Sequence, residues 1–151
     1  MLWFIATHGR PANLLPGSRP GRFMAGLWKH DLAELFLGDP ASGRYLEFNL
    51  APNGAWWSGE FSAPRVPAGD EAFPGVATFA ELAPDGGWVA AMAIPLPTLE
   101  EKISFGATTR LNVSFILGSP DQRFLSAADL GDGEPDFHRP ERFRPVDFRD
   151  A

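Results

Sequence analysis

Residues 44–61 carry the pattern that most constrains the fold, an alternating segment followed by a turn signal. Over residues 44–50 the side chains alternate between an apolar and a polar face, which is typical of a β-strand buried on one side. Asn53-Gly54 follows, and this pair tolerates the positive φ angles of a tight hairpin turn. The stretch therefore predicts an antiparallel hairpin. Its apolar face comprises Leu46, Phe48 and Leu50, and its polar face Tyr45, Glu47 and Asn49.

The pairing of the two hairpin strands depends on the length of the turn. A two-residue turn at Asn53-Gly54 gives one face that is apolar throughout, to which Trp57 belongs. A three-residue turn would set Phe48 opposite Ser58 and mix the faces, so the pattern favours the two-residue turn. We therefore expect the neighbouring tryptophans to point in opposite directions, with Trp57 in the core and Trp56 on the polar face.

The rest of the chain is divided into many short segments. Sixteen glycines and fifteen prolines among 151 residues break helices and supply turns. Strands are expected at residues 2–7, 33–37, 76–82, 88–94, 103–108, 111–117 and 122–126, with an edge strand at 146–148 and one helical turn at 98–102. This pattern predicts a single all-β domain over residues 1–151, an antiparallel β-sandwich of the jelly-roll kind, with a closed barrel as the alternative.

Charge and hydropathy exclude several classes of protein. A net charge of −6 argues against a nucleic-acid binder, which needs a basic surface. No apolar run approaches the roughly 20 residues that a membrane-spanning helix needs. Residues 1–6 are too short for the apolar core of a signal peptide and no basic residue precedes them, so we expect a cytoplasmic chain, exported only as part of a longer precursor. The absence of cysteine excludes disulfides and thiolate chemistry.

The polar face of the hairpin is the first candidate binding surface. There Trp56 presents a flat ring beside Glu47 and Asn49. A sugar stacks its C–H face on such a ring while its hydroxyls bond to carboxylates and amides. Glu47 would also lie opposite Glu60, and opposed like charges destabilise a sheet unless a ligand or an arginine compensates. The arginines considered for this role are Arg44 and Arg110.

Several blocks of sequence resemble a known family. The blocks are LWKHDLAELFL at 27–37, YLEFNLAPNGAWW at 45–57, GGWVAAMAIPLPTL, RLNVSF and PDFHRPERF at 135–143. In this order they are similar to the family 9 carbohydrate-binding modules and their DOMON-like relatives, over most of residues 23–146. The resemblance implies an antiparallel β-sandwich that binds a sugar through a pair of tryptophans and nearby polar side chains, without catalysis. It also implies, in some modules, a structural calcium ion.

The resemblance and the hairpin face together give the expected site. The positions that match the family are Trp28, Asp31, Glu34, Tyr45, Glu47, Trp56 or Trp57, and Asn112. Ser114 stands where relatives often carry an arginine, and the FLSAADL segment lacks a tryptophan often found near that point. An oligosaccharide or polysaccharide is the expected partner, with no cofactor apart from a structural calcium. The carbohydrate-binding residues are predicted to be Trp28, Glu34, Tyr45, Glu47, Asn49, Trp56 and Asn112.

Other functions are less well supported by the residues. Glu34 or Glu47 suits a glycosidase, which uses two carboxyls, but nothing in the sequence makes one an acid and the other a base. The three histidines are widely spaced, and no nucleophile elbow occurs. The acidic segment 129–136 offers oxygen ligands without the spacing of an EF-hand loop. We therefore expect a binding domain and not an enzyme, with a structural or protein-interaction sandwich as the alternative.

Overall fold

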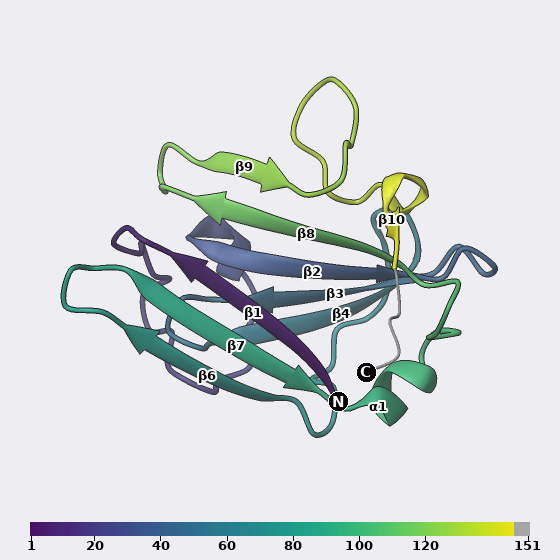
Figure 1. The fold of residues 1–151 in the computed structure, drawn as a ribbon, viewed down its shortest axis with the longest axis horizontal. Coiled ribbons are helices and arrows are strands. Elements are labelled where there is room, and N and C mark those ends of the chain that lie inside the picture. Colours follow the sequence, from purple (N-terminus) through teal and green to yellow (C-terminus); the bar gives the residue numbers. More distant parts are fainter. Residues whose placement is uncertain (147–151) are drawn as a thin grey trace.

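The computed structural model describes residues 1–146, which form two antiparallel sheets packed face to face (Figure 1). The smaller sheet has the order β1-β7-β6, and the larger has the order β10-β8-β2-β3-β4-β5, with β9 also pairing with β8. The predicted antiparallel β-sandwich is confirmed. In the described residues no helix is long and apolar enough to cross a membrane. The strands are β1 (Leu2–His8), β2 (Leu32–Gly38), β3 (Tyr45–Leu50), β4 (Trp56–Ala63), β5 (Val66–Gly69), β6 (Ala77–Leu82), β7 (Trp88–Ile94), β8 (Arg110–Leu117), β9 (Arg123–Ser126) and β10 (Arg144–Pro145).

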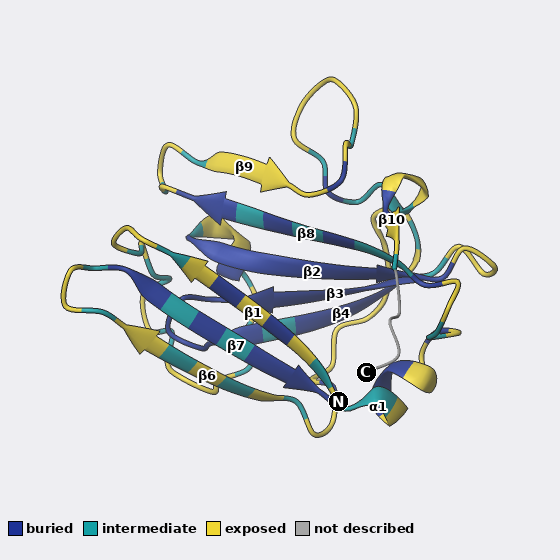
Figure 2. Cartoon of the chain, viewed as in Figure 1, coloured by how far each residue is buried: buried dark blue, intermediate teal, exposed yellow. Residues whose placement is uncertain are grey.

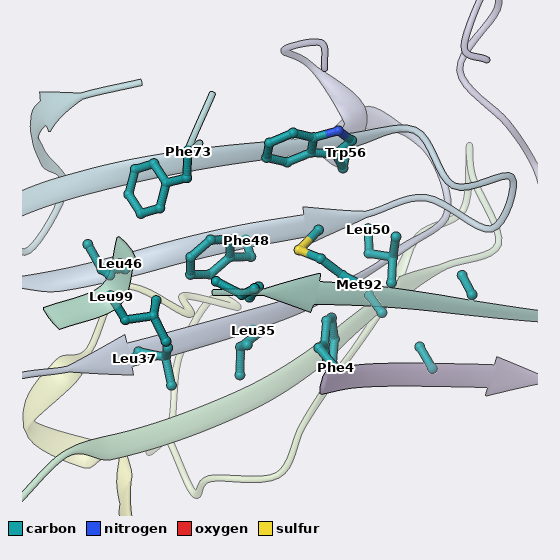
Figure 3. Close-up of a cluster of buried hydrophobic side chains, with 14 of the residues drawn as sticks. Phe4, Leu35, Leu37, Leu46, Phe48, Leu50, Trp56, Phe73, Met92 and Leu99 are labelled. Carbon is teal, nitrogen blue, oxygen red and sulfur yellow. The ribbon is translucent and has the colours of Figure 1, made fainter. Parts of the chain in front are cut away.

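The main core lies between the two sheets. Strands of both sheets direct alternate apolar side chains into this space, as the period of two requires. Helix α1 (Leu96–Glu100) closes one end of it with Leu99, which is fully buried. Figure 3 shows the side chains that meet there. They include Phe4, Leu35, Leu37, Leu46, Phe48, Leu50, Trp56, Phe73, Met92 and Leu99.

The larger sheet is also covered on its outer face. Every residue of β2 and β3 is buried, so both strands are dark blue along their length in Figure 2. A second apolar cluster lies on this face, where residues from distant loops pack against the strands. The short 3-10 helix η1 (Leu27–Lys29) contributes to this cover. The cluster contains Leu27, Leu32, Phe36, Tyr45, Ala51, Ala55, Phe61, Ile116, Phe137 and Phe143.

The hairpin forms where the sequence predicts it, but the predicted register is wrong. The loop has three residues, since the Ala51 N–H donates to the Ala55 carbonyl at 2.8 Å. Gly54 has a φ of +83°, which is the left-handed residue of a type I turn with a bulge. Leu50 therefore lies opposite Trp56. A slip of one residue turns every side chain of β4 to the other face, so Trp56 is in the core and Trp57 points outward.

Polar side chains on the inner face of β4 are tolerated because each has partners. The Ser58 hydroxyl donates to the Glu71 carbonyl at 3.1 Å and accepts the Phe73 N–H at 3.3 Å. Glu60 pairs with Arg44, one of the two arginines considered for this role, and with Lys102 at 3.2 Å. Glu47 and Glu60 do not oppose each other, since Glu47 lies opposite Gly59.

Two further elements differ from prediction. Residues 103–108 form an irregular segment, in which the Ser104 N–H donates to the Asp39 carboxylate at 3.2 Å and the Gly106 N–H donates to Thr109 Oγ1 at 2.9 Å. The helical turn begins at Leu96, and the Thr98 hydroxyl bonds to the Pro74 carbonyl instead of capping it. The predicted edge strand at 146–148 lies, apart from its first residue, outside the described residues.

Candidate functional site

One groove crosses the outer face of the larger sheet. It consists of two adjoining cavities of about 310 and 430 Å³. Asn49, Trp57, Phe61 and Asp70 are found only in the smaller cavity, and Glu34 and Phe124 only in the larger one. We call the combined feature the groove. The residues that line both of its parts are Trp28, Glu47, Arg65 and His138.

Two tryptophans form its aromatic walls. Trp28 on η1 is 54% exposed, and Trp57 on β4 is partly exposed. The indole of Trp57 lies across Gly59, two residues further along the same face, where a Cβ atom would overlap the ring. The missing side chain at Gly59 therefore lets the ring lie close to the sheet. A flat, partly exposed indole of this kind is a stacking surface.

Two buried glutamates form the floor of the groove. Glu34 on β2 lies beside Ser114 of β8, whose hydroxyl donates to Glu34 Oε2 at 2.7 Å. Glu47 Oε1 accepts a hydrogen bond from the amide of Asn49 at 2.9 Å. Burial raises the pKa of Glu34 to about 8, and the nearby Glu47 charge adds to this effect. Burial likewise raises the pKa of Glu47 to about 7, so this pair of carboxyls retains protons near neutral pH.

Tyr45, buried beneath the groove, orients His138, which lines it. The Tyr45 hydroxyl accepts the Arg65 N–H at 3.1 Å, and His138 Nδ1 lies 2.7 Å from the same oxygen. Burial raises the pKa of Tyr45 to about 12, so the phenol stays protonated and donates a hydrogen bond to Nδ1 of the neutral ring. The remaining ring proton of His138 is then on Nε2, 3.8 Å from Glu47 Oε2. Burial lowers the pKa of His138, which favours this neutral form.

One buried acceptor in the groove wall has no partner among the described residues. The Asn49 side chain is 2% exposed, its amide nitrogen donates to Glu47, and its Oδ1 accepts no hydrogen bond. Because the Asn49 nitrogen donates to Glu47 Oε1, the Asn49 oxygen is the atom directed away from Glu47. A buried acceptor without a donor costs about 1–3 kcal/mol. A ligand that donates to this atom would recover that free energy.

The structure brings together four of the residues predicted for the site and separates the other three from it. Trp28, Glu47, Asn49 and Glu34 line the groove. Tyr45 is fully buried below it and positions His138. The placement of Trp56 on this face is wrong, because the three-residue loop turns its indole into the core, as Figure 3 shows.

Asn112 lies on the same sheet face but does not line the groove. Its Oδ1 accepts hydrogen bonds from the Ser126 hydroxyl at 3.1 Å and from the Ala128 N–H at 2.9 Å. These bonds connect β8 to β9 and to the segment that follows it. Asn112 thus holds β9, whose Phe124 lines the groove, in place.

Several residues of the groove are absent from the predicted site, among them Trp57, His138, Arg65 and Asp70. Trp57 would have been found by choosing the three-residue loop. His138 lies within the PDFHRPERF block, and nothing in that block showed that it faces Glu47. Arg65 and Asp70 lie in a segment for which the sequence predicts no strand, and no periodicity there shows which way a side chain points.

Metal ligation has little support in the described part of the chain. Within residues 1–146 no group of three or more His, Asp or Glu side chains is arranged to hold a metal ion. In the acidic segment 129–136, Asp136 pairs with Arg65 at 2.9 Å, and Asp129 accepts the Gly131 N–H at 3.0 Å. The structural calcium ion remains a prediction from the family resemblance.

Comparison with known proteins supports the fold more than the family. No family model matches the chain. It is 29% identical over 140 residues to the UPF0462 protein C4orf33 homolog of Rattus norvegicus, a match that covers 88% of this chain and 66% of that protein. The fold is similar to the crystal structure of a putative carbohydrate-binding protein from Bacteroides uniformis, with a TM-score of 0.71 and 15% identity. That match covers 94% of this chain and 69% of the other.

Proposed function

We propose that the chain is a non-catalytic carbohydrate-binding domain whose ligand lies in the groove. The observation that carries this proposal is the presence of two tryptophans, Trp28 and Trp57, beside buried polar groups with fixed orientations. Carbohydrate recognition needs a flat apolar surface and a few precisely oriented polar groups. The Bacteroides uniformis protein, described as a putative carbohydrate-binding protein, adds support by its likeness of fold.

Each part of the groove has a role in such binding. The C–H face of a sugar stacks on the partly exposed ring of Trp57, with Trp28 as a second surface. Sugar hydroxyls donate to Asn49 Oδ1, which has no donor within residues 1–146, and to the Glu47 carboxyl. The Nε2–H group of His138 donates to a sugar oxygen. These groups are held before the ligand arrives, which reduces the entropy lost on binding.

The proposal is tested by calorimetric titration with a broad panel of neutral oligosaccharides. We expect the Trp57→Ala variant to bind at least about tenfold more weakly than the native chain, a loss of about 1.4 kcal/mol. The matched control is Trp3→Ala, which removes an indole that is 63% exposed on the smaller sheet and should leave binding unchanged. Equal losses in both variants, or no binding across the panel, would favour a structural or protein-interaction role.

A glycosidase is the second candidate because two buried carboxyls with raised pKa values share the groove. A carboxyl that keeps its proton near neutral pH is suited to general acid catalysis. Release of reducing ends from the same oligosaccharides is the measurement that separates the two functions. We expect none; turnover that is lost in Glu47→Gln and Glu34→Gln would replace the binding proposal.

A further inference from the structure

The groove has an excess of acidic groups. Glu34, Glu47 and Asp70 line it. Arg65 is the one guanidinium among its lining residues, and it is paired with Asp136, with Nη2 at 2.9 Å from Oδ1. Burial lowers the pKa of His138, which favours its neutral form. Among the described residues that line the groove, no unpaired guanidinium or ammonium offsets these carboxyls, and the nearest ammonium is that of Lys29 beside Trp28.

The groove also holds hydrogen-bond acceptors suited to a ligand that donates. Asn49 Oδ1 is buried and accepts no hydrogen bond from the part of the chain that the structure describes, while the amide nitrogen of the same side chain donates to Glu47 at 2.9 Å. Glu47 itself offers further lone pairs on its carboxyl. A neutral hydroxyl supplies one hydrogen-bond donor to such a surface. A protonated primary amine supplies three, together with a positive charge.

The aromatic walls suit a positive charge as well as a sugar ring. Trp28, Trp57 and Phe61 line the smaller cavity beside Glu47. The ammonium of Lys29 already lies 5.4 Å from the centre of the Trp28 ring. A cation is attracted to the face of an aromatic ring at this distance, so the same walls favour an ammonium group on the ligand.

We infer that the groove selects a sugar that carries a protonated amine over the same sugar carrying a hydroxyl or an N-acetyl group. This inference rests on the proposed carbohydrate-binding function and adds the chemical class of the ligand. The amine lies against Glu47 and Asn49, and the sugar ring lies on Trp57. An N-acetyl group has neither the charge nor three donors, so it loses both contributions.

A proton leaves the site when the amine binds. The ammonium stabilises the charged form of the buried carboxyls, which hold protons near neutral pH because burial raises the pKa of Glu34 and Glu47. Net release of protons to the buffer is thus a second readout of the same contact. The charged or titratable groups on the elements facing this position are Lys29, Glu34, Tyr45, Glu47, Arg65, Asp70, Asp136 and His138.

The experiment compares three β-1,4-linked oligomers of equal length that differ only at carbon 2. They are oligomers of glucosamine, of N-acetylglucosamine and of glucose, titrated calorimetrically at a mildly acidic pH in two buffers of different ionisation enthalpy. We expect the glucosamine oligomer to bind at least about tenfold more tightly than the other two, with proton release. Glu47→Gln and Asp70→Asn should each reduce this preference, whereas the control Glu81→Gln on the smaller sheet should not.

The outcomes distinguish failure of this inference from failure of the proposed carbohydrate-binding function. Equal affinity for the three oligomers overturns the inference and leaves carbohydrate binding in place. Absence of binding to all three also overturns it, and the broader neutral panel then decides the proposed function by itself. Displacement of the oligomer by a simple amine at the same concentration would show a general cation site and overturn the inference too.

Discussion

Trp56 and Trp57 are neighbours in sequence and lie on opposite faces of the larger sheet. Trp56 packs edge-on against Phe23, with ring centres 5.0 Å apart, and its indole N–H donates to the Gly21 carbonyl at 3.3 Å. Trp57 instead lies over Gly59 at the wall of the groove. One indole therefore serves packing, and the other is available to a ligand.

This division predicts different costs for the two alanine substitutions. Trp56→Ala leaves a cavity in the core and should lower the free energy of unfolding by about 3–5 kcal/mol. Trp57→Ala should cost less, about 1–2 kcal/mol, because the ring is only partly buried. Urea unfolding of both variants measures the difference. The reverse order would contradict the three-residue loop and the position of Trp57 in the groove.

At the level of the element, the loop between β3 and β4 sets the pairing of the whole hairpin. Gly54 holds a φ of +83°, and its carbonyl accepts the Thr78 hydroxyl of the smaller sheet at 2.6 Å. Asn53 supports the loop from within, since its Oδ1 accepts the Ala55 N–H at 3.2 Å. The loop therefore fixes the register and also joins the two sheets at one end.

A substitution at Gly54 tests this role. Gly54→Ala must adopt a left-handed conformation and place a Cβ 3.3 Å from that of Ala80, so we expect a loss of more than about 1 kcal/mol in unfolding free energy. Gly106→Ala is the control, because its backbone has no positive φ and no atom lies within 4 Å of the added carbon. Chemical denaturation of both measures the contrast, and similar losses would show that the loop is not strained by a side chain.

At the level of the whole molecule, the strands could be predicted from sequence better than the faces could. Alternation and turn residues locate β3, β7 and β8 within about a residue, because they depend on local geometry. The cover of the outer face comes from distant segments, including Phe137 and Phe143. No local pattern shows that both faces of a sheet are buried. The register predicted for β4 assumed one buried face, and it was wrong for this reason.

The same difference between local patterns and contacts of distant segments decides which residues of the site could be predicted. Glu47 and Asn49 could be placed on one face because residues 44–50 alternate, whereas Glu34 was assigned to the site from the family resemblance. Arg65 and His138 lie in segments without a period, and only the folded chain brings them beside Glu47. Local sequence could thus give the floor of the groove but not the residues from loops that complete it.

The buried carboxyls also affect the stability of the whole fold. A carboxyl with a raised pKa binds a proton more tightly in the folded chain than in the unfolded chain, so its contribution to stability is complete below about pH 4.5 and declines as pH rises. For Glu34 the decline continues to about pH 8, and for Glu47 to about pH 7. Each titrating group changes the unfolding free energy by at most about 1.4 kcal/mol per pH unit.

Glu34→Gln isolates this effect from other titrating groups. His138, whose pKa burial lowers, acts in the opposite direction, because its contribution to the stability of the fold increases as pH rises through the usual titration range of histidine. His138 is present in both chains. The unfolding free energy of the native chain minus that of Glu34→Gln should therefore decrease steadily from pH 4.5 to 8. Urea unfolding at several pH values measures this difference, with the exposed Glu81→Gln as control. A flat difference would mean that Glu34 is charged across this range, in which case the floor of the groove holds no protonated carboxyl at that position.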